Sequence, residues 1–290
     1  MHKFLRAIGF SEITKKDLEI VLDEVIARPE IMKITKDSEG NEFAELSGSF
    51  APNVGITVRG TYQEDDSFHM DYYYPYMFGT SITTNEQIDV EKHAEKESYA
   101  GVCDEMNLGV TLIFYVQNVA DYLAEKNLHR QHSQRGAMIA GLSTEGKILC
   151  PVMERQKTDA PAIRKAEQHN QLIAQAREGN EDAIESLTLE DMDTYALISQ
   201  RIMKEDVFSI VKSTFMPFGI ESDQYAVLGE IIDCVSMENK LTHEKLYGMK
   251  ILCNGIRFDV CINEKDLLGE PAVGRRFRGN VWMQGNLCLE

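Results

Sequence analysis

Acidic and tyrosine side chains gather in the first half of the chain, around the short apolar segment Tyr99–Cys103. Two carboxylates can serve as acid and base in the hydrolysis of a sugar linkage, and aromatic rings stack on sugar faces. This combination is therefore the first candidate for chemistry. Its acidic members are Glu91, Glu95, Glu97, Asp104 and Glu105, and its tyrosines are Tyr72, Tyr73, Tyr74 and Tyr99.

One function hypothesis follows: a hydrolase that uses the acidic loop Glu91–Glu105, with or without a metal, on a polyhydroxylated substrate. The sequence does not contain the separation between carboxylates on which such chemistry depends. Tyrosines at strand spacing belong more often to a core or a sheet surface. We therefore favour a structural role for the tyrosines and expect the acidic segment between Thr80 and Asn107 to be an ordered loop with a short strand.

Two histidines, His129 and His132, have a spacing that could direct both imidazoles toward one metal ion, with Cys103, Asp104 or Glu105 completing a tetrahedral set. The surrounding segment lacks apolar periodicity, and no second His or Cys pair has ligand spacing. We therefore favour a solvated loop and predict neither a metal nor another cofactor.

Arginine and aromatic residues recur near the C-terminus, where Arg275, Arg276 and Arg278 precede Trp282. Such a basic and aromatic face could bind a phosphate, a short single strand or an acidic peptide. The alternative is that these arginines pair with carboxylates of the same chain. We expect Trp282 itself to be buried, because large aromatic side chains mostly are.

Other catalytic signatures are missing from the sequence. There is no GxSxG motif, no phosphate-binding loop and no GxGxxG turn. The acidic neighbours of Cys103 would raise the pKa of its thiol, which makes it a poor nucleophile.

Composition narrows the class of protein further. The net charge of −17 is spread along the chain, which disfavours general binding to nucleic acid and to anionic membranes. The six cysteines occur singly, as expected of reduced thiols. No apolar run is long enough to span a membrane, and we expect a cytoplasmic protein.

The elements that must position these residues begin with Gly109–Asn118, an almost continuous apolar run that predicts a central strand covered on both faces. Helical spacing predicts a helix over Lys15–Ala27. Four strands are expected to follow as an antiparallel meander, at Ile31–Thr35, Asn41–Ser49, Val54–Gln63 and Ser67–Tyr76. Helical turns are predicted at Val119–Lys126, and a hairpin with its turn at Ser143–Gly146 is predicted within 137–152.

Helical patterns dominate 161–204, with Gly179 and Asn180 at the junction of a helical hairpin. Strand patterns then return in Tyr225–Val235, Leu246–Cys253, Ile256–Ile262 and Phe277–Gln284, and Asn254-Gly255 is a strong hairpin signal. We predict an α+β fold in three parts: an antiparallel α+β domain at 1–155, a helical connector at 156–219 and a small β-barrel domain at 220–290.

Four segments together resemble an uncharacterised family of about this length from Gram-positive anaerobic bacteria, a domain of unknown function. They are MHKFLRAIGF, KESYAGVCDEMNLGVTLIFYVQN, AREGNEDAIESLTLEDMDTY and NEKDLLGEPAVGRRFRGNVWMQGNL. The resemblance spans nearly the whole chain and implies a bacterial cytosolic protein, but it carries no activity, cofactor or site residue.

Taken together, these patterns favour a non-catalytic binding or regulatory protein whose partner is an unidentified protein or small molecule. The acidic-loop hydrolase remains the alternative.

Overall fold

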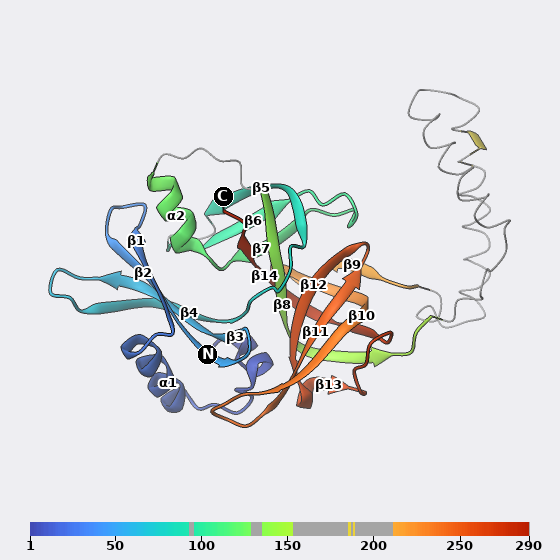
Figure 1. The fold of residues 1–290 in the computed structure, drawn as a ribbon, viewed down its shortest axis with the longest axis horizontal. Helices are drawn as coiled ribbons and strands as arrows, with labels where there is room; N and C mark the ends of the chain where they lie inside the picture. Colours follow the sequence, from blue (N-terminus) through green and yellow to red (C-terminus); the bar gives the residue numbers. More distant parts are fainter. Residues whose placement is uncertain (93–95, 129–134, 153–184, 187, 189–210, 290) are drawn as a thin grey trace. The chain divides into compact units, whose positions relative to one another are not determined.

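The structure, a computed structural model, describes residues 1–92, 96–128, 135–152, 185–186, 188 and 211–289 (Figure 1). It is mainly β, with few helices. The chain divides into two compact units, Met1–Cys150 with Ser213–Glu290, and Pro151–Lys212. Most of the second unit lies outside the described residues, and so does nearly all of the helical connector that the sequence predicts.

A four-stranded antiparallel sheet forms the first layer of the larger unit. Its strands are β1 (Ile31–Lys36), β2 (Glu42–Ala51), β3 (Val54–Tyr62) and β4 (Phe68–Met77), in the order β1-β2-β3-β4. The predicted meander is confirmed.

Helix α1 (Lys15–Ala27) packs against β2 and β3 of this sheet (Figure 1). Thr14 caps it, because its Oγ1 accepts a hydrogen bond from the backbone N–H of Asp17 at 3.2 Å. Leu18, Val21 and Leu22 recur on its buried face, so the predicted helix is confirmed.

The second, larger sheet contains strands from both halves of the chain. The strands are β5 (Thr84–Lys92), β6 (Tyr99–Cys103), β7 (Leu112–Val116), β8 (Arg135–Leu149), β9 (Thr214–Pro217), β10 (Gln224–Glu238), β11 (Lys245–Cys253), β12 (Ile256–Asn263), β13 (Leu267–Leu268) and β14 (Arg276–Leu287). Two short helices, α2 (Val119–Asn127) and the 3₁₀ turn η2 (Glu264–Asp266), connect some of these strands, and a third, the 3₁₀ turn η1 (Lys3–Ile8), precedes α1.

Two long strands, β8 and β14, organise this sheet. They pair with each other along most of their lengths, and β8 also pairs with β5, β12 and β13, while β14 also pairs with β7 and β10. The pairings from β10 through β11, β12, β8 and β14 lead back to β10. A strand from the first half of the chain therefore completes the ring of C-terminal strands.

This arrangement differs from the expected domain limits. Strands of 1–155 and 220–290 share hydrogen bonds, and one apolar cluster joins residues as distant in sequence as Phe4, Ile56, Leu246 and Trp282. The first and last segments form one compact unit because neither buries its apolar surface without the other.

The prediction of a hairpin within 137–152 is wrong, because β8 continues without a break through the proposed turn at Ser143–Gly146. Gly146 does not have a positive φ there; it pairs with Gly279 of β14 and Leu267 of β13. The Ser143 hydroxyl donates to the carbonyl of Asn280 at 2.8 Å. Pairing with distant strands outweighs the local turn preference of the sequence.

The predicted central strand is shorter than expected. Within β7, Leu112, Phe114 and Val116 are buried while Ile113 and Tyr115 are half-buried, so one face is more fully covered than the other. The hairpin at Asn254-Gly255 is confirmed, with φ of 47° and 86°. Among the described residues no helix combines the length and apolar character needed to cross a membrane.

Candidate functional site

Glu97, one of the predicted acidic-loop residues, links neighbouring segments of the fold through its side chain. Its carboxylate accepts hydrogen bonds from the Ser38 and Tyr99 hydroxyls and pairs with Lys92 at 3.0 Å. Burial acts to raise the pKa of Glu97, but these donors outweigh it and hold that pKa below its ordinary value. A carboxylate held in this way is poorly suited to shuttle a proton.

The other acidic candidates lie apart from Glu97. Asp104 and Glu105 follow the C-terminal end of β6 and bond to Thr111 and Asn107, while Glu97 precedes its start. A strand rises about 3.3 Å per residue, so the whole of β6 separates the two ends. Glycosidase carboxylates lie roughly 5–9.5 Å apart, which this separation exceeds. Glu91 is exposed on β5, and Glu95 lies outside the described residues, as do His129 and His132.

The C-terminal arginines and Trp282 do not form an exposed platform. Arg276 is buried, and its Nε donates to the carbonyl of Cys150 at 2.9 Å, whereas Arg278 is exposed. Arg275 bonds to the carbonyl of Glu270. Trp282 is only 6% exposed and its Nε1 donates to Asp223 at 2.7 Å, which confirms the predicted burial.

Tyr72 and Tyr74 belong to a buried cluster around Arg59, a residue that the sequence analysis missed. Arg59 on β3 is fully buried, and its Nη2 lies 2.6 Å from a carboxylate oxygen of Glu45 on β2. Its guanidinium also donates to the hydroxyls of Tyr72, Tyr74 and Tyr115 at 2.7–3.3 Å. The cluster ties the four-stranded sheet to β7.

The charge of Arg59 is well compensated. Desolvation acts to lower the pKa of Arg59, but Tyr115, Tyr72, Tyr74 and Glu45 surround it and raise that pKa above its ordinary value. The other carboxylate oxygen of Glu45 accepts from the backbone N–H of Ala120 at 3.0 Å, at the start of α2. With every group engaged, the cluster is structural.

Counting from the sequence would not have found this pair. Counting outward from the turn at 52–53 places Glu45 opposite Gly60. A β-bulge between Ser49 and Ala51 shifts the register by one residue, and Glu45 therefore lies opposite Arg59.

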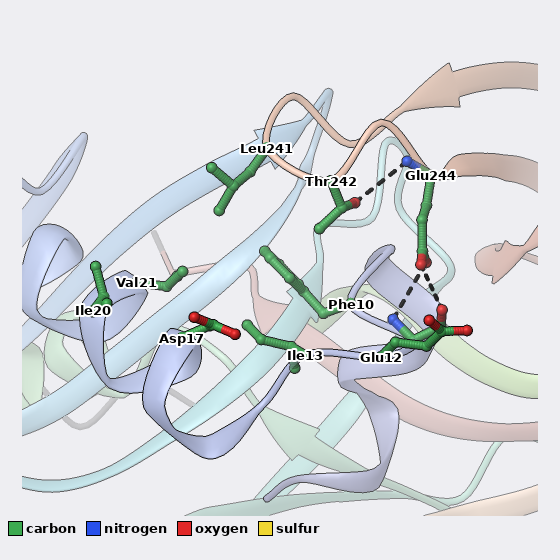
Figure 2. A pocket seen from close by; sticks show the side chains of 10 residues that line it. Phe10, Glu12, Ile13, Asp17, Ile20, Val21, Leu241, Thr242 and Glu244 are labelled. Carbon is green, nitrogen blue, oxygen red and sulfur yellow. Dashed lines mark hydrogen bonds between the residues drawn. The ribbon is translucent and has the colours of Figure 1, made fainter.

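An open concave site lies beside α1, and we call it the α1 groove. It has a volume of about 440 Å³. Figure 2 shows side chains converging on it from α1, from the segment 10–13 and from the turn between β10 and β11. The lining residues are Phe10, Ser11, Glu12, Ile13, Asp17, Ile20, Val21, Leu241, Thr242 and Glu244.

The walls of the α1 groove are fixed by contacts between η1 and the β10–β11 turn. Asn239 Nδ2 donates to the carbonyl of Ile8 at 2.8 Å, and the Thr242 hydroxyl donates to that of Gly9 at 2.6 Å. Gly9 has a φ of 92°, and a Cβ there would lie 2.7 Å from the Cβ of Asn239. Only glycine allows this close approach.

Every charged residue that lines the α1 groove is acidic. Glu244 accepts from Ser11, from Asn263 at 2.6 Å and from Lys265 at 2.8 Å. Burial acts to raise the pKa of Glu244, but these donors hold it below its ordinary value, so the group stays ionised at neutral pH. Asp17 and Glu12 are exposed beside it.

Apolar side chains form the remaining surface of the α1 groove. Phe10 and Val21 are buried at its floor, whereas Ile20 is 58% and Leu241 50% exposed. A smaller hollow of about 170 Å³ continues the groove and shares Val21 and Leu241 with it. The smaller hollow is also lined by Arg28 and Lys240, so the wholly acidic set of charged residues belongs to the α1 groove alone.

The lining of the α1 groove contains no cysteine or histidine, and its serine hydroxyl is bonded to Glu244. Within the described part of the chain, no three His, Cys, Asp or Glu side chains gather closely enough to hold a metal ion.

No curated protein and no solved structure matches the chain. A family described as a domain of unknown function, E. rectale gene description (DUF3881), matches residues 5–285. The match covers nearly the whole length and agrees with the resemblance seen in the four sequence segments. The chain belongs to this family of unknown function.

Proposed function

We propose that the protein is a non-catalytic binding protein whose α1 groove takes an amphipathic, basic peptide segment of a partner protein. One observation carries this proposal: the α1 groove exposes apolar side chains to solvent, and every charged residue in its lining is acidic. Apolar side chains of the partner would cover Ile20 and Leu241 while its lysines or arginines approach Glu12 and Asp17.

Exposure favours a macromolecular partner for this groove over a small molecule. Small-molecule sites bury most of their ligand, whereas Ile20 and Leu241 are both at least half exposed. Exposed apolar residues gathered in one groove are typical of protein-interaction sites.

Charge selects the kind of partner. At a net charge of −17, a second copy of the chain or another acidic protein is repelled, and a basic segment is attracted. Steering of this kind raises association rates and weakens as salt is added.

Catalysis by the acidic loop has less support. Glu97 is held by three side chains, and Asp104 and Glu105 lie beyond the other end of β6. We therefore place the binding function ahead of the hydrolase alternative.

Two further features belong to the proposal. The ring of pairings through β8, β10, β11, β12 and β14 supports a small closed barrel that holds the β10–β11 turn in place. Six free cysteines support a reducing cytoplasm, and burial raises the pKa of Cys253 and Cys261 to about 12, which keeps these thiols protonated.

The test uses two fluorescein-labelled peptides with leucines at helical positions i, i+3, i+4 and i+7, one with lysine and one with glutamate elsewhere. Fluorescence anisotropy should show saturable binding of the lysine peptide alone. Ile20→Asp and Leu241→Asp should each weaken it by about tenfold, the equivalent of about 1.4 kcal/mol.

Val273→Asp is the matched control, because Val273 is 65% exposed, lies outside the groove and gains the same charge. Its affinity should equal that of the unchanged protein. Equal affinities for all three aspartate variants would show that the lysine peptide follows net charge alone, and the proposal would fail.

A further inference from the structure

A second hollow, separate from the α1 groove, lies between the two sheets, and we call it the inter-sheet cavity. Its volume is about 290 Å³, and its lining comes from β1, β2, β3, α2, β8 and β14 and from the segments that follow β4 and β7. It shares no lining residue with the α1 groove. At about 30 Å³ per water molecule, it has room for roughly ten waters or one molecule of monosaccharide size.

Gln117, one of the residues that line this cavity, carries a buried acceptor with no donor among the described residues. Gln117 is 4% exposed, and its Nε2 donates to the carbonyl of Met77 and to Gln284 Oε1, both at 2.9 Å. Its own Oε1 receives no hydrogen bond. Leaving such an acceptor unsatisfied is costly, so a donor from outside the chain is expected there.

Exchanging the oxygen and nitrogen positions of the Gln117 amide does not satisfy this acceptor. The carbonyl of Met77 can only accept, so it requires the NH₂ group of Gln117 to face it. Gln284 is fixed in turn, because its Nε2 donates to the carbonyl of Pro75 at 2.8 Å and its Oε1 accepts from the N–H of Met77. The hydrogen bonds therefore fix the orientation of both amides, and Gln117 Oε1 remains without a donor among the described residues.

More acceptors accompany Gln117. The hydroxyls of Ser47 and Thr57 lie 2.7 Å apart, and both residues are buried in the lining. A hydroxyl has two lone pairs, so one hydrogen bond between this pair leaves acceptor capacity unused. The polar part of the cavity is suited to a molecule with several O–H donors.

The charges in the lining are already paired. Glu45 is bound to Arg59 at 2.6 Å, and Lys33 to Asp121 at 2.5 Å. A charged ligand would compete with these pairs, whereas a neutral ligand leaves them intact.

The aromatic ring of Phe78 contributes apolar surface to the lining of the inter-sheet cavity. Phe78 lines the cavity and is half-buried, and it stacks on Tyr76 with ring centroids 4.2 Å apart. Stacking on Tyr76 occupies one face of Phe78. Aromatic faces pack well against the C–H surface of a sugar ring.

We propose that the inter-sheet cavity is a binding site for a small neutral polyol of monosaccharide size, which donates a hydroxyl to Gln117 Oε1 and packs against Phe78. The site is independent of the peptide function proposed for the α1 groove. Either one can fail while the other stands.

The test measures binding of D-glucose and myo-inositol by saturation-transfer-difference NMR on the full chain, with D-glucosamine and D-glucuronate as charged counterparts. At least one neutral polyol should bind saturably, and the charged counterparts should bind at least tenfold more weakly. Ser47→Ala should weaken binding by about three- to tenfold, the range expected for one neutral hydrogen bond.

A second test fills the cavity with a bulky side chain and leaves the hydrogen-bonded amides of Gln117 and Gln284 unchanged. Ile31 and Ile34 both lie on β1 and are similarly exposed, at 42% and 45%, but only Ile31 lines the cavity. Ile31→Trp should abolish binding, and Ile34→Trp, the matched control, should leave it unchanged.

Three results would overturn the proposal: no saturable binding of either neutral polyol to folded protein, equal binding to both tryptophan variants, or tighter binding of a charged counterpart. The first would mean that water alone satisfies Gln117.

Discussion

The α1 groove and the inter-sheet cavity both have volumes of a few hundred cubic ångströms, but they differ in how far their charged lining residues are paired. In the groove, Glu244 pairs with Lys265 at 2.8 Å, whereas Glu12 and Asp17 are exposed and form no ion pair among the described residues. The cavity is built between two sheets, and each charge in its lining is paired. Exposed apolar side chains beside unpaired carboxylates favour a basic macromolecule, whereas paired charges and a buried, unsatisfied acceptor favour a small neutral molecule.

Their supports differ as well. The groove depends on η1 and the segment that follows it, which are anchored by Phe4 and His2 against Trp282 at centroid distances of 5.1 and 4.9 Å. The cavity depends on Arg59, which holds Glu45 in its wall. Substitutions at the two anchors should therefore separate the two sites.

The largest effect is expected at Arg59. Arg59→Met leaves Glu45 as a buried, unpaired carboxylate, which should lower the free energy of unfolding by about 3–5 kcal/mol. Urea denaturation measures this loss. Under conditions where the variant remains folded, polyol binding should disappear while peptide binding persists.

The double variant Arg59→Met, Glu45→Gln is the control for the charge argument. Because it removes both charges, it should regain part of the lost stability. A double variant less stable than Arg59→Met would contradict the view that the unpaired carboxylate causes the loss.

Removing the other anchor should have a slightly smaller effect. Trp282→Ala should cost about 3 kcal/mol, the low end for a buried tryptophan, because His2 and Phe4 can move partly into the space. It should weaken peptide binding more than polyol binding. Emission from the unchanged protein should be blue-shifted and poorly quenched by iodide, since Trp282 is the sole tryptophan.

Lowering the pH should destabilise the contact between His2 and Trp282. Burial, with a smaller contribution from Lys3, lowers the pKa of His2 from 6.5 to about 4. Below pH 6.5 the unfolded chain takes up a proton at His2 and the folded chain does not. The stabilisation is therefore complete above pH 6.5 and is lost as the pH falls toward 4.

The expected loss is about 2 kcal/mol, because the anchor can partly open and hydrate the ring. Urea denaturation between pH 7 and 4 measures it, with His2→Phe as the control. This variant should have a flatter pH dependence, and an identical slope in both proteins would assign the acid effect to other groups.

Some of this architecture could be read from the sequence. Helix α1, the β1–β4 meander and the Asn254-Gly255 hairpin rest on neighbouring residues, and all three are present. The unbroken strand β8 could not be predicted in this way. Its segment Ser143–Gly146 resembles a turn and stays extended through pairing with the distant strands β12, β13 and β14.

The candidate sites show the same limit. The pairing of Glu45 with Arg59 depends on a β-bulge in β2 that counting from the turn does not reveal. The α1 groove exists because Ile20 and Leu241, from distant parts of the chain, line the same hollow. The bond between Asn239 and the carbonyl of Ile8 is one contact that brings these segments together. No local pattern encodes a contact between residues so far apart in the chain.

The smallest effects are expected at the hydroxyl pair in the cavity wall. Ser47→Ala and Thr57→Val should each cost about 1 kcal/mol in the free energy of unfolding, since each leaves one buried hydroxyl without its partner. The double variant should cost less than the sum. Strict additivity would show that the two hydroxyls are not coupled in solution.

The central claim, that the α1 groove binds a basic segment, is tested most directly by a ¹⁵N–¹H NMR titration of the full chain with the lysine peptide. Amide shifts should change around Phe10–Ile13, along α1 and at Leu241–Glu244, and they should stay constant around Gln117. Shifts scattered over the acidic surface, or none at the groove, would contradict the account.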